Sequence, residues 1–329
     1  MGVLNQDQEE KLRILFMGTP DFSVQFLKKI VETDEIVAIV TQRDRPRKRG
    51  HRLEYSEVKK FALERSFTLF QPERITNANF VRSVNELAPD LIVVVAFGKV
   101  LPREVLSIPK KGCINIHFSL LPKYRGPAPV QWALLNGDNY TGVSLILMKE
   151  EIDVGDIILQ RKVSIDAYDN YLTLLRKLCN IGTILLEQTL NLIREGRVSA
   201  HPQDDSGISY APFLKKSDGE INWQDSSRRI FNQIRALNPW PGTYIKLKGG
   251  KKVNILEAKI TPLLQEGKKK VFPKPGEIVE IRKGEGFVVA CGEGGLLVTR
   301  VQPESKSIQK AYDYLQGARL RVGDIWGKG

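Results

Sequence analysis

Alternating strand and helix patterns over the first half of the chain constrain its fold more than any other feature. Residues 91–97, Leu-Ile-Val-Val-Val-Ala-Phe, form the most apolar segment, as expected for a strand buried on both faces of a parallel sheet. Further strands are predicted at residues 12–17, 35–41, 68–70, 113–117 and 142–148, and helices at residues 21–33, 56–65, 77–87, 130–135 and 171–194. Repeated units of this length predict an α/β fold with a doubly wound, Rossmann-like and mostly parallel sheet.

The pattern changes in the last third of the chain. Residues 202–219 are rich in Asp, Ser, Gly and Pro, a composition typical of a linker. Beyond them we expect a helix at residues 226–237 and short strands at residues 243–247, 252–260, 276–281, 286–290 and 296–301. Short strands separated by Gly and Lys turns predict a small, OB-like β-barrel. The expected domains are therefore an α/β catalytic domain over residues 1–204, a linker over 205–219 and a barrel over 220–329.

Charge is distributed unevenly between these parts. The net charge is +12, and from Lys215 to the C-terminus 22 Lys and Arg stand against 12 Asp and Glu. This asymmetry indicates a polyanion partner, with nucleic acid favoured over an anionic membrane. A solvated basic surface that keeps the protein soluble explains the same charge equally well.

Composition also indicates the compartment in which the protein is expected. No window holds eighteen consecutive apolar residues, and the polar N-terminus lacks the features of a secretory signal. The three cysteines are far apart, so neither a disulfide framework nor a zinc site follows from their spacing. We expect a cytoplasmic protein with three buried thiols, no membrane contact and no metal.

The loop after the first strand argues against a dinucleotide cofactor. It contains Gly18-Thr19-Pro20-Asp21-Phe22, whereas a dinucleotide-binding loop requires Gly-x-Gly-x-x-Gly. Pro20 also removes a backbone donor that a phosphate would use. NAD binding is disfavoured despite the fold class, and Asp21 is expected to cap the helix that follows.

Two polar side chains project from the strand predicted at residues 113–117. Strand side chains alternate between faces, so Cys113, Asn115 and His117 share one face. They lie toward the C-terminal end of the strand, where α/β sheets place their ligand crevice. His117 can exchange a proton near neutral pH, and the amide of Asn115 can donate to an oxyanion. A structural hydrogen-bonded pair is the alternative interpretation of the same two residues.

Two loops complete the candidate site. Residues 119–129 form a long loop stiffened by three prolines, which suits a binding site or a locked connection. Residues 150–156 form a short acidic turn that includes Asp153. A carboxylate in this turn could orient a histidine or a water molecule, although most such residues are simply exposed.

These residues together resemble a known family. Asn115-x-His117, Ser119 to Pro122, Tyr124-Arg125-Gly126 and Asp153 are similar in order and spacing to the formyltransferases that use 10-formyltetrahydrofolate. The resemblance spans almost the whole chain through the segments Gly18 to Phe22, Thr41-Gln42, Asp44 to Pro46, Phe70 to Pro72, Ala96 to Gly98, Asn238 to Gly242 and Gly323-Asp324. Within that family the chain is most similar to the enzymes that act on methionyl-tRNA.

The resemblance implies roles for particular residues. It implies that Asn115, His117 and Asp153 are catalytic: the first two would stabilise an oxyanion, and Asp153 would position His117 or a water and assist proton transfer. It implies folate contacts for Ser119, Leu120, Leu121, Pro122, Phe97, Gly98, Val100 and Leu101. It implies tRNA contacts for the basic loop, namely Arg43, Arg45, Arg47, Lys48, Arg49 and Arg52, with Arg49 as the expected key contact. This loop carries Arg and Lys where the family usually has small residues.

The implied function is transfer of a formyl group from 10-formyltetrahydrofolate to the amino group of initiator methionyl-tRNA, by a monomer without an obligate protein partner. One alternative is a formyltransferase for another amine, such as an amino sugar nucleotide or glycinamide ribonucleotide. A hydrolase or dehydrogenase portion of a folate enzyme is a further possibility. A non-catalytic RNA-binding protein and a nucleotide-dependent dehydrogenase are the rivals from other classes.

Overall fold

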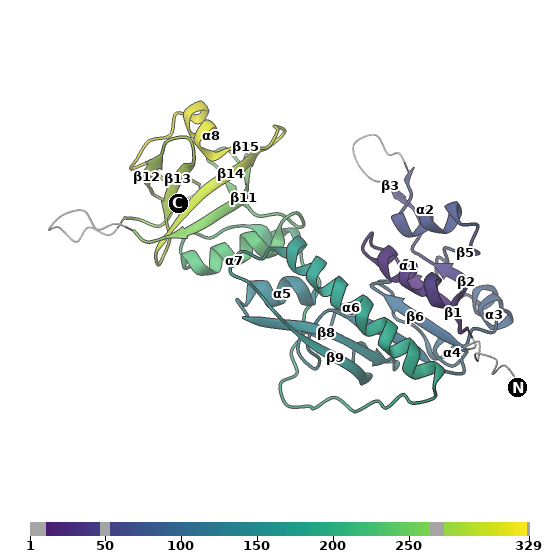
Figure 1. The fold of residues 1–329 in the computed structure, drawn as a ribbon. Helices are drawn as coiled ribbons and strands as arrows, with labels where there is room; N and C mark the ends of the chain where they lie inside the picture. Colours follow the sequence, from purple (N-terminus) through teal and green to yellow (C-terminus); the bar gives the residue numbers. More distant parts are fainter. Residues whose placement is uncertain (1–10, 47–52, 264–272, 328–329) are drawn as a thin grey trace, which may run out of the picture. The chain divides into compact units, whose positions relative to one another are not determined.

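The computed structural model describes residues 11–46, 53–263 and 273–327 (Figure 1). The chain divides into two compact units. Unit 1 comprises residues 1–129, 140–164 and 175–212, and unit 2 comprises residues 130–139, 165–174 and 213–329.

Unit 1 is built on a seven-stranded sheet in the order β5-β2-β1-β6-β7-β8-β9. Its strands are β1 (Arg13–Gly18), β2 (Glu35–Val40), β5 (Leu69–Phe70), β6 (Leu91–Val95), β7 (Cys113–His117), β8 (Tyr140–Leu147) and β9 (Asp156–Ser164). Strands β5, β2, β1, β6 and β7 are parallel, and β8 and β9 run antiparallel to their neighbours. The predicted α/β class with a mostly parallel sheet is confirmed.

Helices cover both faces of this sheet, which explains the continuous apolar strands. The helices of unit 1 are α1 (Ser23–Thr33), α2 (Glu57–Glu64), α3 (Ala78–Glu86), α4 (Arg103–Leu106) and most of α6 (Tyr171–Arg194), whereas α5 (Pro129–Leu135) belongs to unit 2 apart from Pro129 (Figure 1). Gly182 of α6 lies against Phe26 of α1 and Ile116 of β7, so α1 and α6 share one face. Buried side chains of α3 and α4 pack with strand residues such as Met17 and Val94 on the other face.

One predicted cap is wrong. Helix α1 begins after Phe22, and no side chain caps its first turn. A backbone turn precedes the helix, in which Ser23 N donates to Pro20 O at 2.9 Å and Val24 N to Asp21 O at 3.2 Å. Asp21 therefore lies one residue before the N-cap position, too early to receive the exposed helical N–H groups. By contrast, Ser56 and Asn77 do cap α2 and α3 with their side chains.

Unit 2 contains an antiparallel sheet in the order β10-β11-β14-β13-β12, with β15 paired to β14. Its strands are β10 (Tyr244–Lys246), β11 (Lys252–Thr261), β12 (Ile278–Arg282), β13 (Gly286–Ala290), β14 (Gly295–Pro303) and β15 (Gln309–Lys310). Helices α7 (Ser227–Leu237) and α8 (Ala311–Ala318) pack on it around one core that includes Phe287 and the fully buried Trp326. An antiparallel β domain after the α/β domain is as predicted, whereas β15 and α8 were not predicted.

Candidate active site

Strand β7 presents two polar side chains at the carboxyl edge of the parallel sheet. It lies between β6, to which it is parallel, and β8, to which it is antiparallel. Its apolar residues Ile114 and Ile116 are buried. The alternation of a strand then places Asn115 and His117 together on the opposite face. His117 is buried, and Asn115 is half-buried.

Asp153 faces both of these side chains. Its Oδ1 accepts a hydrogen bond from Asn115 Nδ2 at 3.2 Å and lies 3.5 Å from His117 Nδ1. The turn between β8 and β9 carries Asp153 with a φ of 57°, a left-handed conformation that residues with a Cβ seldom adopt. The structure thus brings together the three predicted side chains, although they come from segments 38 positions apart.

Asn115, His117 and Asp153 form a trio, and the loop after β7 supplies further hydrogen-bonding partners of it. Gly126 N donates to Asp153 Oδ2 at 2.8 Å, and His117 Nε2 lies 2.9 Å from the carbonyl oxygen of Tyr124. Both ring nitrogens of His117 therefore face an acceptor. An imidazolium carries a donor on each nitrogen, so it is the ring form that donates to both acceptors at once.

The first part of the same loop is fixed by buried hydrogen bonds. Ser144 Oγ donates to Ser119 O at 2.7 Å and accepts from Leu121 N at 3.1 Å and Gln160 Nε2 at 2.7 Å. Ser119 and Leu121 are buried, whereas Leu120 and Pro122 are half-buried. A ligand would therefore meet this segment, expected to contact folate, mainly through Leu120, Pro122 and backbone atoms.

The loop after β6 contains exposed residues and follows a strand that pairs with the strand of Asn115. Val94 of β6 pairs with Asn115 of β7, and Ala96, Gly98 and Val100 are exposed, whereas Phe97 and Leu101 are buried. The carbonyl oxygen of Phe97 accepts a 2.8 Å hydrogen bond from Gln42 Nε2. Gly98 has a φ of 77°, a left-handed conformation that disfavours a residue with a Cβ there.

The loop after β6 lies at the edge of the sheet where doubly wound folds commonly bind their ligands. The chain winds outward through β2 on one side of β1 and through β6 and β7 on the other, so the winding direction reverses between β1 and β6. Doubly wound sheets bind ligands at the carboxyl ends of strands on either side of such a reversal. Residues 96–100 follow β6 and so lie on one side of this reversal.

The basic loop is described only in part. Arg43 is exposed and forms an ion pair of 3.2 Å with Glu73. Arg45 lies in β3 (Arg45–Pro46), which pairs with β4 (Leu53–Glu54). The other expected tRNA contacts lie outside the described residues, namely Arg47, Lys48, Arg49 and Arg52.

The cysteine on the catalytic face is chemically unsuited to act as a nucleophile. Cys113 is buried, and burial raises the pKa of its thiol to about 12. A thiol with this pKa is almost fully protonated at neutral pH, and the thiolate is the nucleophilic form. Covalent thiol catalysis is therefore disfavoured on the face that Cys113 shares with Asn115 and His117.

Sequence reasoning missed several partners of the trio. Gln203 donates to the carbonyl oxygens of Asp153 and Gly155, and Arg125 donates to Gln203. Ser209 Oγ accepts from Tyr124 N at 2.9 Å. Gln203 and Ser209 fall in the segment with a linker-like composition, and a hydrogen bond to a backbone atom leaves no residue pattern that identifies it.

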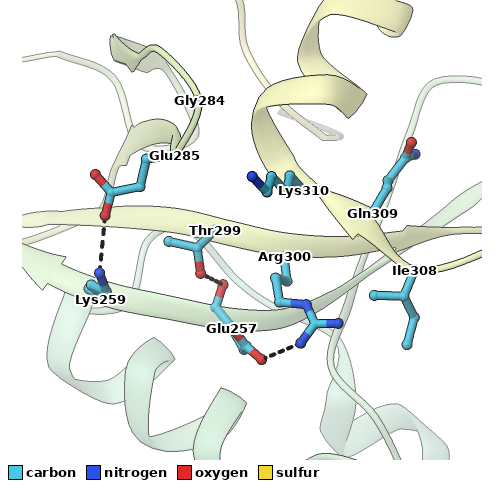
Figure 2. Close-up of a pocket in the computed structure, with 9 residues that line it drawn as sticks. All are labelled: Glu257, Lys259, Gly284, Glu285, Thr299, Arg300, Ile308, Gln309 and Lys310. Atoms are coloured by element: carbon cyan, nitrogen blue, oxygen red, sulfur yellow. Dashed lines mark hydrogen bonds and ion pairs between the residues drawn. The ribbon is translucent and has the colours of Figure 1, made fainter.

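Unit 2 carries a separate groove of about 590 Å³ (Figure 2). Its lining residues are Glu257, Lys259, Gly284, Glu285, Thr299, Arg300, Ile308, Gln309 and Lys310. The two carboxylates pair with Lys259 and Arg300, each at 3.0 Å, so most of the groove's charge is neutralised internally. None of the three predicted catalytic residues lines this groove.

Comparison with known proteins decides the family. The family described as "Formyl transferase" matches residues 11–190, and "Formyl transferase, C-terminal domain" matches residues 214–319. The chain belongs to the formyltransferase family. A methionyl-tRNA formyltransferase of Thermodesulfovibrio yellowstonii is 42% identical over 94% of this chain and 97% of the relative. One of Moorella thermoacetica is 43% identical over 96% of this chain and 99% of the relative.

Solved structures of the family share the fold at lower identity. HypX from Aquifex aeolicus in complex with tetrahydrofolic acid gives a TM-score of 0.65 at 19% identity, over 97% of this chain and 50% of that one. WlaRD, a sugar 3N-formyl transferase, gives 0.64 at 20% identity, over 91% of this chain and all of that one. At this level of identity the likeness concerns the fold alone.

Proposed function

We propose that this protein transfers the formyl group of 10-formyltetrahydrofolate to the α-amino group of initiator methionyl-tRNA in the cytoplasm. The observation that carries the proposal is the identity of about 40% to enzymes of that name along nearly the full length of both chains. The identity spans the α/β domain that carries the trio and the basic C-terminal domain. A match confined to the α/β domain would leave the acceptor open.

The trio fits transfer of an acyl group between two amines. Formyl-folate supplies an activated formyl group, so no nucleophile from the protein is required. The methionyl amine attacks the formyl carbon and forms the new C–N bond, which gives a tetrahedral intermediate with an anionic oxygen; this intermediate then collapses as the bond to the folate nitrogen breaks. We infer that Asn115 stabilises the transient oxyanion, because one N–H of its amide bonds to Asp153 and the other is free to donate.

His117 and Asp153 complete this electrostatic arrangement. The buried ring of His117 lies between a carboxylate and a backbone carbonyl, which holds it rigidly. We infer that a protonated His117 offsets the negative charge of the oxyanion. We infer that Asp153 orients this ring and, directly or through a water, relays the proton from the attacking amine to the departing nitrogen.

We assign the folate to the carboxyl edge of the sheet between residues 96–101 and residues 119–122. The exposed residues Ala96, Gly98 and Val100 follow β6, and β6 pairs with β7 at Val94 and Asn115, so a ring bound there would have its reacting nitrogen near the trio. Leu120 and Pro122 provide half-buried apolar contacts. We assign tRNA binding to the basic loop around Arg43 and to the C-terminal domain, with its excess of ten positive charges.

The decisive test is an acceptor comparison with purified protein. Formyl-folate is supplied with methionine-charged initiator tRNA, methionine-charged elongator tRNA, an amino sugar nucleotide or glycinamide ribonucleotide. We expect rapid formylation of the charged initiator tRNA and slower formylation of the elongator. Formylation of a small amine in preference to both tRNAs would refute the proposed acceptor.

A further inference from the structure

The segment that follows α6 runs alongside the candidate active site. It is called the strap here and comprises residues 201–211. His201 exchanges two backbone hydrogen bonds with Ile157 of β9, at 2.8 and 2.9 Å. At the other end, Arg125 N donates to Ser209 O at 2.9 Å, and Ala211 N donates to Arg125 O at 2.8 Å. The strap is thus attached to the sheet at one end and to the loop after β7 at the other.

Gln203 lies two residues after His201 in the strap and connects the strap to the Asp153 turn. Its Nε2 donates to the carbonyl oxygen of Asp153 at 2.7 Å and to that of Gly155 at 2.8 Å. Its Oε1 accepts from Arg125 Nη2 at 2.7 Å and from Nε at 3.1 Å. One side-chain amide therefore makes four hydrogen bonds.

The chemistry of these partners determines the orientation of the amide. A guanidinium group has donors and no acceptor, so it must face the oxygen of Gln203. Carbonyl groups accept and cannot donate, so the NH₂ group must face the turn. Glutamine satisfies this arrangement because it combines an acceptor with two donors, and Arg125 is itself largely buried, at 9% exposure.

The turn that Gln203 holds requires such support. The left-handed conformation of Asp153 is sparsely populated by residues with a Cβ and persists where the surroundings fix it. A Cβ at Gly155 would lie 1.8 Å from Leu147 O, so the turn passes very close to β8. Gln203 binds the carbonyl groups on both sides of Val154, and in this way it fixes the backbone that carries the carboxylate.

We propose that Gln203, oriented by Arg125, is a positioning residue that sets the Asp153 carboxylate against Asn115 and His117. This inference rests on the proposed function for its kinetic consequences and extends that function to a residue outside the trio. Because Gln203 touches backbone carbonyls of the turn and no reacting atom, it acts on turnover through Asp153.

The variant Gln203→Glu tests the proposal with little change in size. A carboxylate still accepts from Arg125 but cannot donate to the two carbonyl groups. We expect turnover to fall about tenfold to hundredfold, the range for a displaced catalytic group, with KM for formyl-folate within about twofold. The matched control is Asn77→Asp, an amide-to-carboxylate change in unit 1 at the start of α3, where the side-chain oxygen still accepts from Asn79 N and Phe80 N. The control is expected to keep wild-type turnover.

Combining Gln203→Glu with a variant that lacks the Asp153 carboxylate separates a positioning role from general destabilisation. In Asp153→Ala the carboxylate is absent, so adding Gln203→Glu should lower single-turnover rates by less than about twofold further. A loss in the double variant as large as the loss in Gln203→Glu alone would overturn the proposal, because the effect would not pass through Asp153.

Hydrogen exchange provides a readout that does not depend on activity. Gly126 N donates to Asp153 Oδ2, so a displaced carboxylate should speed exchange at Gly126 by about tenfold or more, while Ile157 N, bonded to His201, stays unchanged. Wild-type exchange at Gly126 in Gln203→Glu would overturn the proposal. If the wild-type protein formylated no amine, the proposed function would fail, and faster exchange in the variant would still support the positioning role.

Discussion

Replacing Asp153 with asparagine removes one charge and one acceptor while preserving the shape of the side chain. In the native site, Oδ1 faces Asn115 Nδ2 at 3.2 Å and His117 Nδ1 at 3.5 Å, and Oδ2 accepts from Gly126 N at 2.8 Å. Asparagine has one oxygen, so its NH₂ group must face a donor on one of the two sides. In either orientation the negative charge beside His117 is lost.

The structure allows the size of this effect to be worked out. Asparagine removes the negative charge 3.5 Å from His117 Nδ1 and can keep at most one of the hydrogen bonds from Asn115 and Gly126. Removing one preorganised electrostatic group of this kind typically lowers a rate by about a hundredfold to a thousandfold, which is about 2.7–4 kcal/mol in the barrier. Folding should change little, because the asparagine fills the same space.

Single-turnover formylation of charged initiator tRNA, followed together with the thermal midpoint, measures both quantities. The matched control is Asp156→Asn, three positions along the chain, where the carboxylate pairs with Lys149 at 2.7 Å on the surface. Such surface pairs contribute about 1 kcal/mol or less, so the control should retain wild-type rate and stability. An Asp153→Asn enzyme with a rate within threefold of wild type would refute the role assigned to this carboxylate.

Four further predictions follow from the site and the charge distribution. His117→Ala should lower turnover by about a hundredfold or more while formyl-folate still protects the protein against heat; wild-type turnover would exclude its role. Iodoacetamide at pH 8 should leave Cys113 unmodified until the protein is unfolded, since a thiol with a pKa of about 12 is ionised to about one part in ten thousand, and mass spectrometry detects any adduct. Ser144→Ala should lower the free energy of unfolding by about 2–4 kcal/mol in urea titrations, because three buried hydrogen bonds lose their shared partner, whereas the exposed Ser307→Ala should change it by less than about 0.5 kcal/mol. Affinity for initiator tRNA should fall steeply between 50 and 200 mM salt in filter binding, and a flat response would contradict phosphate contacts by the basic C-terminal domain.

The strands and helices of the α/β domain could largely be predicted from the sequence, because hydrophobic periodicity and apolar content are local properties of a segment. Strand β7 and helix α6 begin and end where the alternation and the helical pattern predict. The N-terminus of α1 was missed for a local reason too. A turn begins at Pro20 and delays the helix by two residues, and composition does not distinguish an Asp at the cap from an Asp just before it.

Some contacts within the candidate site follow from local sequence pattern, and others depend on how distant segments pack together. The common face of Asn115 and His117 follows from strand alternation, so residue spacing alone predicts it. Their approach to Asp153 depends on how the β8–β9 turn folds over the sheet, and only the family resemblance linked that residue to them. Gln203 has neither kind of signal, because its partners are backbone carbonyl groups 48 and 50 positions away.

Rigidity is distributed unevenly around the site in a way that suits acyl transfer. Backbone groups of Gly126 and Tyr124 hold the carboxylate of Asp153 and the imidazole of His117, so under the proposed mechanism little reorganisation is required when charge develops on the formyl oxygen. The residues to which we assign the folate, Ala96, Gly98 and Val100, are instead exposed. Because β6 pairs with β7, the same parallel sheet would fix both the proposed ring site and the amide of Asn115. A substitution that shifts β7 relative to β6 should therefore lower turnover more than it weakens folate binding, since catalysis depends on distances that binding tolerates.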